Sequence, residues 1–208
     1  TLCEQDADAL AVTLDAVAEK FGDILPKMQW VNFGGGHHIT RPGYAVETLE
    51  HCIARAQNAW GVTVYLEPGE ACALNAGYLL TRVLDVVQNG GTTVAILDAS
   101  AACHMPDVIE MPYRPPLLFA GDAGQKPCTV RLAGPTCLAG DVIGDYGFDA
   151  VPRAGDLLVF GDMAIYTTCK NNTFNGMPLP AICVRDEAGD VRELVKFGYR
   201  DFKARLGR

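Results

Sequence analysis

The chain lacks both a long apolar run and any paired-cysteine motif, and each absence excludes a class of protein. No apolar stretch of about 18 residues occurs and no basic, apolar leader precedes the first periodic segment, so we expect neither a membrane span nor a secretory signal. Eight cysteines are present, none of them in CxxC or CxH spacing. This distribution is typical of buried, reduced thiols, so we expect no disulfide scaffold, no metal site and a cytoplasmic protein.

An excess of positive charge is also lacking. The formal net charge is −8 at pH 7, and binding to phosphates needs a basic patch, so no nucleic-acid partner is expected. The acidic excess suits a cationic substrate, although plain solubility is the more frequent cause. The 208 residues, of which 49% are hydrophobic, are enough to bury a core. The chain begins with Thr1 rather than Met, which favours a piece of a longer chain or a cleaved product.

Two helix-and-strand pairs are predicted in the first part of the chain. Apolar residues recur at near-helical spacing over residues 6–21 and 46–59, and glycines follow both segments. Apolar strands are expected at 29–33 and 62–66. The order helix, strand, helix, strand with short connections implies parallel strand pairing by right-handed crossovers, as in part of an α/β barrel.

The pattern changes beyond Gly77, where short strand candidates alternate with turn residues. The candidates are residues 78–87, 92–97, 108–111, 129–132, 157–160, 181–184 and 192–197. We therefore expect an α/β domain over residues 1–76 and an antiparallel β-domain over residues 77–208.

The two strands of the first domain each end in a segment suited to a cofactor. Gly34, Gly35 and Gly36 follow the first strand, and backbone N–H groups without neighbouring Cβ atoms can approach an anion. Glu67 follows the second strand, where its carboxylate would stabilise a protonated ring nitrogen. Simpler alternatives remain at this point: a tight turn for the glycines and an acid at a helix N-terminus for Glu67.

Three further segments combine turn residues with chemically active side chains. Residues 134–141 place the thiol of Cys137 four positions from Asp141, although a buried cysteine in a bend is the better explanation on spacing alone. Residues 160–166 and 171–176 place Tyr166 and several amides in loops, where polar residues more often serve a site than a core.

Together, these motifs resemble a known enzyme family. GGG at 34–36, EPG at 67–69, GPTC at 134–137, GDMAIYT at 161–167 and TFNG at 173–176 occur in the order seen in the C-terminal part of the fold-type III pyridoxal-phosphate decarboxylases. This alanine racemase-like group includes ornithine, arginine and diaminopimelate decarboxylases. Residues 100–107 and 137–146 are most similar to its carboxynorspermidine decarboxylase branch. The resemblance covers essentially the whole chain and implies the C-terminal part of a (β/α)8 barrel followed by the β-domain.

The resemblance implies pyridoxal 5'-phosphate as cofactor and assigns roles residue by residue. Gly34–Gly36 match the loop that holds the cofactor phosphate, and Glu67 matches the acid on the pyridine nitrogen. Tyr166 matches a tyrosine that contacts the phosphate. Cys137 matches the catalytic cysteine that enters the partner subunit's site and helps to return a proton after CO2 leaves. A homodimer with shared active sites is therefore expected.

Two departures from the family pattern bear on the substrate. Glu70 stands where relatives commonly have Arg, and Leu138 stands where diaminopimelate decarboxylases have an acid. A negative charge in place of a positive one favours a substrate with an additional amine. Glu70, Asp107 and Asp141 are the expected substrate contacts.

No lysine of the chain matches the family's cofactor-binding lysine, so catalysis is expected to need an N-terminal segment of the same protein. The resemblance then implies decarboxylation of carboxynorspermidine or carboxyspermidine to norspermidine or spermidine. Two alternatives stay open: a decarboxylase of diaminopimelate or another basic amino acid, and a non-catalytic regulator or pyridoxal-binding homologue.

Overall fold

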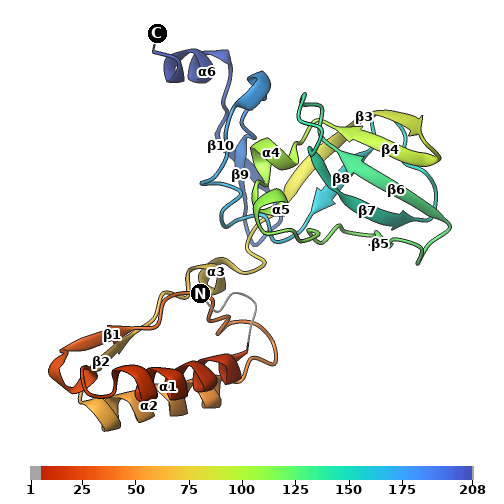
Figure 1. The fold of residues 1–208 in the computed structure, drawn as a ribbon. Helices are drawn as coiled ribbons and strands as arrows, with labels where there is room; N and C mark the ends of the chain where they lie inside the picture. Colours follow the sequence, from red (N-terminus) through yellow and green to blue (C-terminus); the bar gives the residue numbers. More distant parts are fainter. Residues whose placement is uncertain (1–5, 208) are drawn as a thin grey trace. The chain divides into compact units, whose positions relative to one another are not determined.

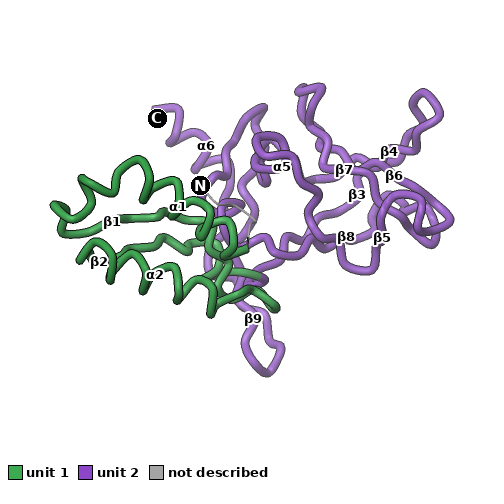
Figure 2. The backbone as a smooth tube through the Cα atoms, turned by 60° about the horizontal axis from the view of Figure 1, so that its bottom comes forward, with its two compact units in different colours: residues 1–74 green, residues 75–208 purple. Residues whose placement is uncertain are grey.

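The computed structural model of the chain describes residues 6–207. They form two compact units, residues 1–74 and residues 75–208, which Figure 2 shows in green and purple. Within the described residues, every cysteine is a free thiol, no helix is long and apolar enough to cross a membrane, and no group of acidic, histidine and cysteine side chains could hold a metal. Cys3 lies outside the described residues.

The first unit contains two long helices beside a pair of short strands (Figure 1). Helix α1 spans Ala7–Phe21 and α2 spans Val46–Trp60, in agreement with the two predicted helices. Strand β1, Trp30–Asn32, pairs in parallel with β2, Thr63–Tyr65, as predicted. The unit is completed by the 3-10 helix η1, Leu25–Lys27, and the short helix α3, Gly69–Ala73.

The ends of these helices are fixed by side-chain and backbone caps. The Asp6 carboxylate accepts from Ala7 N at 2.7 Å and from Ala45 N at 3.0 Å, so one cap joins the start of α1 to the start of α2. Gly61 ends α2 in the left-handed conformation, at φ 67°. The core of the unit lies between the helices and the strands, and consists of Ala7, Leu10, Leu14, Tyr44, Leu49, Cys52 and Ala56.

The second unit is built on a six-stranded sheet in the order β5-β7-β6-β4-β3-β8 (Figure 1). The strands are β3 Leu79–Asn89, β4 Thr92–Leu97, β5 Gly121–Asp122, β6 Cys128–Ala133, β7 Val142–Phe148 and β8 Leu157–Phe160. A separate antiparallel pair is formed by β9 Ile182–Arg185 and β10 Val191–Val195. The predicted β-domain is confirmed, but the sheet is mixed, because β4 and β6 pair in parallel.

The short helices of the second unit lie outside the sheet. They are α4 Ala101–His104, α5 Asp107–Glu110, the 3-10 helix η2 Phe174–Gly176 and α6 Tyr199–Arg205.

One predicted strand is wrong and two strands were missed. Residues 108–111 were expected to be a strand, but most of them belong to α5, because Pro106 lies in the helical region at φ −61° and opens a helical turn. Strand β5 has only two residues, too few to give a pattern. Strand β7 contains Gly144 and Gly147, and glycine has low strand propensity.

The main core of the second unit lies on one side of the sheet and contains the fully buried Phe160. Tyr146 packs edge-on against Phe160 with ring centroids 6.1 Å apart, and its hydroxyl donates to Pro115 O at 2.8 Å. Burial of the ring raises the pKa of Tyr146. The phenol is therefore neutral and serves the packing of the unit.

Candidate functional site

The glycine triplet forms a loop in which each residue has a steric reason to lack a side chain. Gly34 and Gly36 adopt left-handed conformations at φ 75° and 85°. A Cβ atom on Gly35 would lie 2.8 Å from the carbonyl oxygen of Glu67. The loop therefore passes directly against the segment that carries Glu67.

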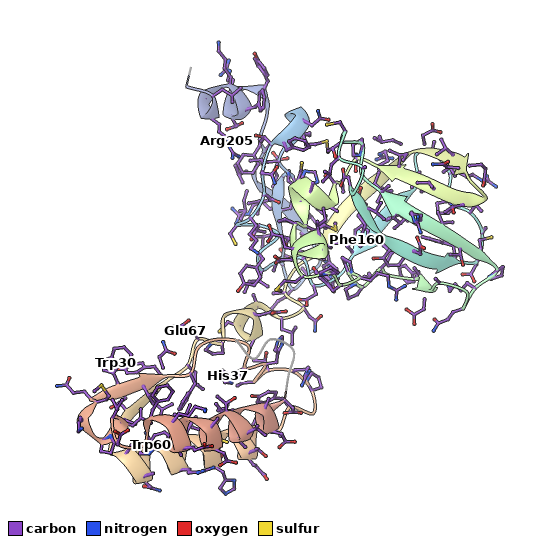
Figure 3. The ribbon with its side chains drawn as sticks, viewed as in Figure 1. Trp30, His37, Trp60, Glu67, Phe160 and Arg205 are labelled. Carbon is purple, nitrogen blue, oxygen red and sulfur yellow. The ribbon has the colours of Figure 1, made fainter. Side chains whose placement is uncertain are left out.

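Asn32 links this loop to the Glu67 side chain. Its Nδ2 donates to Glu67 Oε1 at 2.6 Å, and its Oδ1 accepts from Gly34 N at 2.8 Å. The Glu67 backbone N–H donates to Gly34 O at 2.8 Å. Figure 3 shows Glu67 and His37 on the same side of Trp30, the first residue of β1. No role was predicted for Asn32, although a polar residue at the end of an apolar strand was a usable signal.

The segments that follow β1 and β2 carry the kinds of groups that pyridoxal phosphate needs. The N–H groups of Gly35 and Gly36 have no acceptor among residues 6–207, so two donors remain for a phosphate. Glu67 is exposed and presents a carboxylate beside them. The residues present therefore fit the cofactor: donors for its anionic end and an acid for its ring nitrogen.

Two buried histidines follow the glycine loop. Burial lowers the pKa of His37, which holds its ring neutral near pH 7. His38 Nε2 lies 3.7 Å from a carboxylate oxygen of Glu70, with side-chain exposures of 6% and 34%. Glu70 is thus placed in the same unit as Glu67, at the start of α3.

In the second unit, Cys137 lies on an exposed loop between β6 and β7. Its backbone N–H donates to Asn175 Oδ1 at 3.3 Å. Asn175 itself adopts a left-handed conformation, at φ 58°. The GPTC and TFNG motifs, 38 residues apart at these two positions, are therefore in direct contact.

Asp107 and Tyr166 meet through Lys170. The Lys170 ammonium donates to the Asp107 carboxylate and lies 3.2 Å from Glu110 Oε2. It also lies 5.0 Å from the centre of the Tyr166 ring. The hydrogen bond to Asp107, and to a smaller extent the one to Glu110, raises the pKa of Lys170. The sequence did not identify Lys170 as a partner of Asp107.

The backbone of Tyr166 is strained. Its φ is 58°, in the region that L side chains rarely adopt, and a bulky residue there is an outlier. Such outliers persist only where the surroundings hold them, and they cluster at functional sites. This observation favours a functional position for Tyr166.

Asp141 is the most buried of the three predicted substrate contacts, with 3% exposure against 8% for Asp107. Its carboxylate accepts from the hydroxyls of Ser100 and Thr136 at 2.9 Å and 2.6 Å. The structure thus places Asp141 and Cys137 in one loop, and Asp107 and Tyr166 around one lysine.

The chain is similar to pyridoxal-dependent decarboxylases. Residues 7–164 match the family model "Pyridoxal-dependent decarboxylase, C-terminal sheet domain". The chain is 43% identical to the carboxynorspermidine/carboxyspermidine decarboxylase of Campylobacter jejuni, over 98% of this chain and 56% of that relative. It is 42% identical to the carboxyaminopropylagmatine decarboxylase of Synechocystis, over 99% and 54%. The chain thus spans about half the length of the curated relatives that it matches.

Solved structures give the same result. The crystal structure of carboxynorspermidine decarboxylase from Campylobacter jejuni, complexed with norspermidine, matches with a TM-score of 0.85 at 43% identity, over 99% of this chain and 59% of that chain. A diaminopimelate decarboxylase structure shares the fold, with a TM-score of 0.73 at 23% identity, over 96% of this chain and 52% of that one.

Proposed function

The chain belongs to the family of pyridoxal-dependent decarboxylases, and from this premise we propose that the protein of which it is part decarboxylates carboxynorspermidine or carboxyspermidine to norspermidine or spermidine. The observation that carries the proposal is the similarity to the Campylobacter enzyme over nearly the whole chain, including the structure with bound norspermidine. In this proposal, residues 1–76 are part of a (β/α)8 barrel and residues 77–208 form the β-domain.

In the proposed enzyme, the first unit holds pyridoxal 5'-phosphate. The cofactor supplies an electron sink when bound. Gly34–Gly36 would bind its phosphate through backbone N–H groups, because the loop leaves two donors without acceptors. Glu67 would hold the proton on the pyridine nitrogen, with Asn32 fixing one carboxylate oxygen at 2.6 Å. The lysine that binds the cofactor covalently would come from an N-terminal segment of the same protein.

The second unit would supply groups that act on the substrate. We assign to the exposed thiol of Cys137 the return of a proton to the substrate carbon after CO2 leaves. Tyr166 would contact the cofactor phosphate, and its strained backbone supports a functional position. In this proposal Cys137 enters the site of a partner subunit, so that the enzyme is a homodimer with shared active sites.

Two acids would recognise the additional amine of the substrate. Glu70 has 34% side-chain exposure and would attract an ammonium group. Asp107 binds the Lys170 ammonium, and this contact supports a preference of the position for a cation. A substrate ammonium would share or replace that contact, whereas a terminal carboxylate would be repelled.

Three alternatives remain as outcomes of a test. Carboxyaminopropylagmatine carries a guanidinium in place of an amine, and the Synechocystis relative is nearly as similar as the Campylobacter one. The diaminopimelate alternative has weaker support, because that structural match lies at 23% identity and shows the fold alone. A non-catalytic homologue would turn over none of these substrates.

The proposal is tested by Glu67→Gln in the full-length protein. The amide retains an oxygen that can accept from Asn32, so the loop contact is kept while the negative charge is removed. We expect kcat for carboxynorspermidine to fall by about two orders of magnitude or more, because the ring nitrogen loses its counter-charge. Glu50→Gln, an exposed change on α2, is the matched control and should turn over normally. Equal turnover by both variants would refute the role of Glu67, and no turnover by the native protein would favour the regulator.

A further inference from the structure

The Asp141 carboxylate is a buried junction between the loop of residues 134–141 and the start of α4. Four donor groups point at it. Ser100 Oγ lies 2.9 Å from both oxygens, and Ala102 N donates at 3.2 Å. Thr136 donates from its hydroxyl at 2.6 Å and from its backbone N–H at 3.3 Å. A carboxylate has about four lone-pair sites, so this one is fully occupied and has no capacity left for a substrate ammonium.

On the loop side, Asp141 holds the residues on both sides of Cys137. Thr136 precedes Cys137 directly, and its Oγ1 also accepts from Leu138 N at 3.4 Å. Gly134 N donates to Asp141 O at 2.8 Å, and a Cβ atom on Gly134 would lie 2.2 Å from Asp141 Oδ2. The carboxylate therefore packs directly on the loop backbone, and only glycine fits at position 134.

On the helix side, the same carboxylate is joined to a rigid network. Ser100 caps α4 by accepting from Cys103 N at 3.1 Å, and its backbone N–H donates to His104 Nδ1 at 3.1 Å. Nδ1 is thus an acceptor, so His104 Nε2 bears the proton and donates to Pro178 O at 2.9 Å. Serine, histidine and aspartate do not form a nucleophilic triad here, because the serine hydroxyl donates to the aspartate and is fully buried.

A second connection closes the network around Cys137. Asn172 Nδ2 donates to Ala102 O at 2.8 Å and Asn172 N donates to Cys103 O at 3.0 Å, so the segment before η2 is fixed to α4. Three residues further on, Asn175 Oδ1 accepts from Cys137 N. Cys137 is therefore tied to α4 through Asp141 on one side and through the 172–175 segment on the other.

We propose that Asp141 is a positioning residue, which fixes the thiol of Cys137 for proton return and does not bind the substrate. This inference rests on the proposed catalytic role of Cys137. The Asp141 carboxylate accepts from four donors, and one of them is the buried Ser100 that caps α4. These contacts restrict the conformation of the loop far more than an exposed loop would be restricted without them.

The test compares Asp141→Asn, Cys137→Ala and the double variant in the full-length enzyme. Asp141→Asn should lower kcat by about tenfold to a hundredfold with KM changed less than about twofold, since a small misplacement of a catalytic group slows the chemical step. Combined with Cys137→Ala, it should have almost no further effect on kcat. Asp149→Asn, an exposed aspartate with 81% side-chain exposure, is the matched control and should behave like the native enzyme.

Several results would overturn the inference in distinguishable ways. A rise in KM with unchanged kcat would make Asp141 a substrate contact. An equal loss of kcat in the Cys137→Ala background would show that Asp141 acts elsewhere. A Cys137→Ala variant with native kcat would refute the role of Cys137 itself, and the positioning proposal with it.

A second measurement needs no turnover. Thr136→Val removes the hydroxyl, and with it the 2.6 Å hydrogen bond to Asp141 and the 3.4 Å one from Leu138 N, while it keeps the shape of the side chain. In hydrogen exchange of the full-length protein, this variant should exchange the amides of residues 134–141 at least about tenfold faster, with α1 and α2 unchanged. Native exchange rates in the loop of this variant would contradict the proposal even if Asp141→Asn fails to fold.

Discussion

Acidification should destabilise the protein through one buried histidine, His104, which is 3% exposed. Burial lowers its pKa, and this effect outweighs the hydrogen bond to Pro178 O and the charges of Asp141 and Asp98, which act in the opposite direction. Protonation of Nδ1 would also break the bond from Ser100 N. The folded state therefore favours the neutral ring, and the unfolded chain binds a proton more readily.

The sign and the size of the effect follow from this difference. An unfolded histidine titrates near pH 6.5 and the folded His104 titrates lower, so its contribution to stability is complete above about pH 6.5 and is lost as the pH falls below it. One proton taken up by the unfolded chain alone corresponds to at most about 1.4 kcal/mol between pH 7.5 and pH 5.5. The hydrogen bond from Arg131 lowers the pKa of Asp145. The contribution of Asp145 to stability is therefore lost only as the pH falls below the ordinary pKa of an aspartate, which lies below the range from pH 7.5 to pH 5.5.

The assay is urea unfolding of the full-length protein at pH 7.5 and pH 5.5, followed by circular dichroism. His104→Gln keeps a donor for Pro178 O but cannot titrate. It should therefore lower the overall stability yet reduce the pH-dependent loss by up to about 1.4 kcal/mol relative to the native protein. His51→Gln, an exposed change on α2, is the control. The contribution of His37, whose pKa is also lowered by burial, cancels in the comparison. If His104→Gln lost as much stability on acidification as the native protein, the reasoning would be wrong.

Two other substitutions test the packing of each unit. Gly35→Ala puts a methyl group 2.8 Å from Glu67 O. We therefore expect the affinity for pyridoxal phosphate to fall by about tenfold or more in a cofactor titration. The control is Gly198→Ala, whose methyl group meets no atom within 4 Å, and this variant should bind pyridoxal phosphate normally. Tyr146→Phe leaves the buried Pro115 carbonyl without its 2.8 Å hydrogen bond and should lower the free energy of unfolding in urea by about 1–3 kcal/mol. Tyr199→Phe, at 75% exposure, should lower it by almost nothing. Equal losses of stability in the two variants would show that the hydrogen bond is unimportant.

The sequence predicted those elements that have a strong local signal. Helices α1 and α2 were recognised because their apolar residues recur at helical spacing and glycines follow both. Strand β7 was missed because Gly144 and Gly147 interrupt its pattern, and α5 was mistaken for a strand because four residues cannot distinguish the two periods. These errors affect short segments whose structure is decided by tertiary contacts.

The candidate site divides in the same way. The rule that parallel strands end at one edge placed Gly34–Gly36 and Glu67 together, and the structure links them through Asn32. The pairing of Asp107 with Lys170 joins residues 63 positions apart, and no local pattern could reveal it. Asp141 was predicted as a substrate contact without knowledge of its four donors, which include the Ser100 hydroxyl, 41 positions away in the sequence, and which only the fold brings together.

The proposed function depends most directly on substrate preference. The decisive measurement is kcat/KM of the native full-length protein and of its Glu70→Gln and Asp107→Asn variants. The substrates to be compared are carboxynorspermidine, carboxyspermidine, carboxyaminopropylagmatine, diaminopimelate, ornithine and arginine. We expect a carboxylated triamine to be preferred, diaminopimelate to be a poor substrate, and both variants to lose about tenfold or more in kcat/KM for the triamine. Preferred turnover of diaminopimelate, or triamine turnover that is indifferent to both substitutions, would contradict the account.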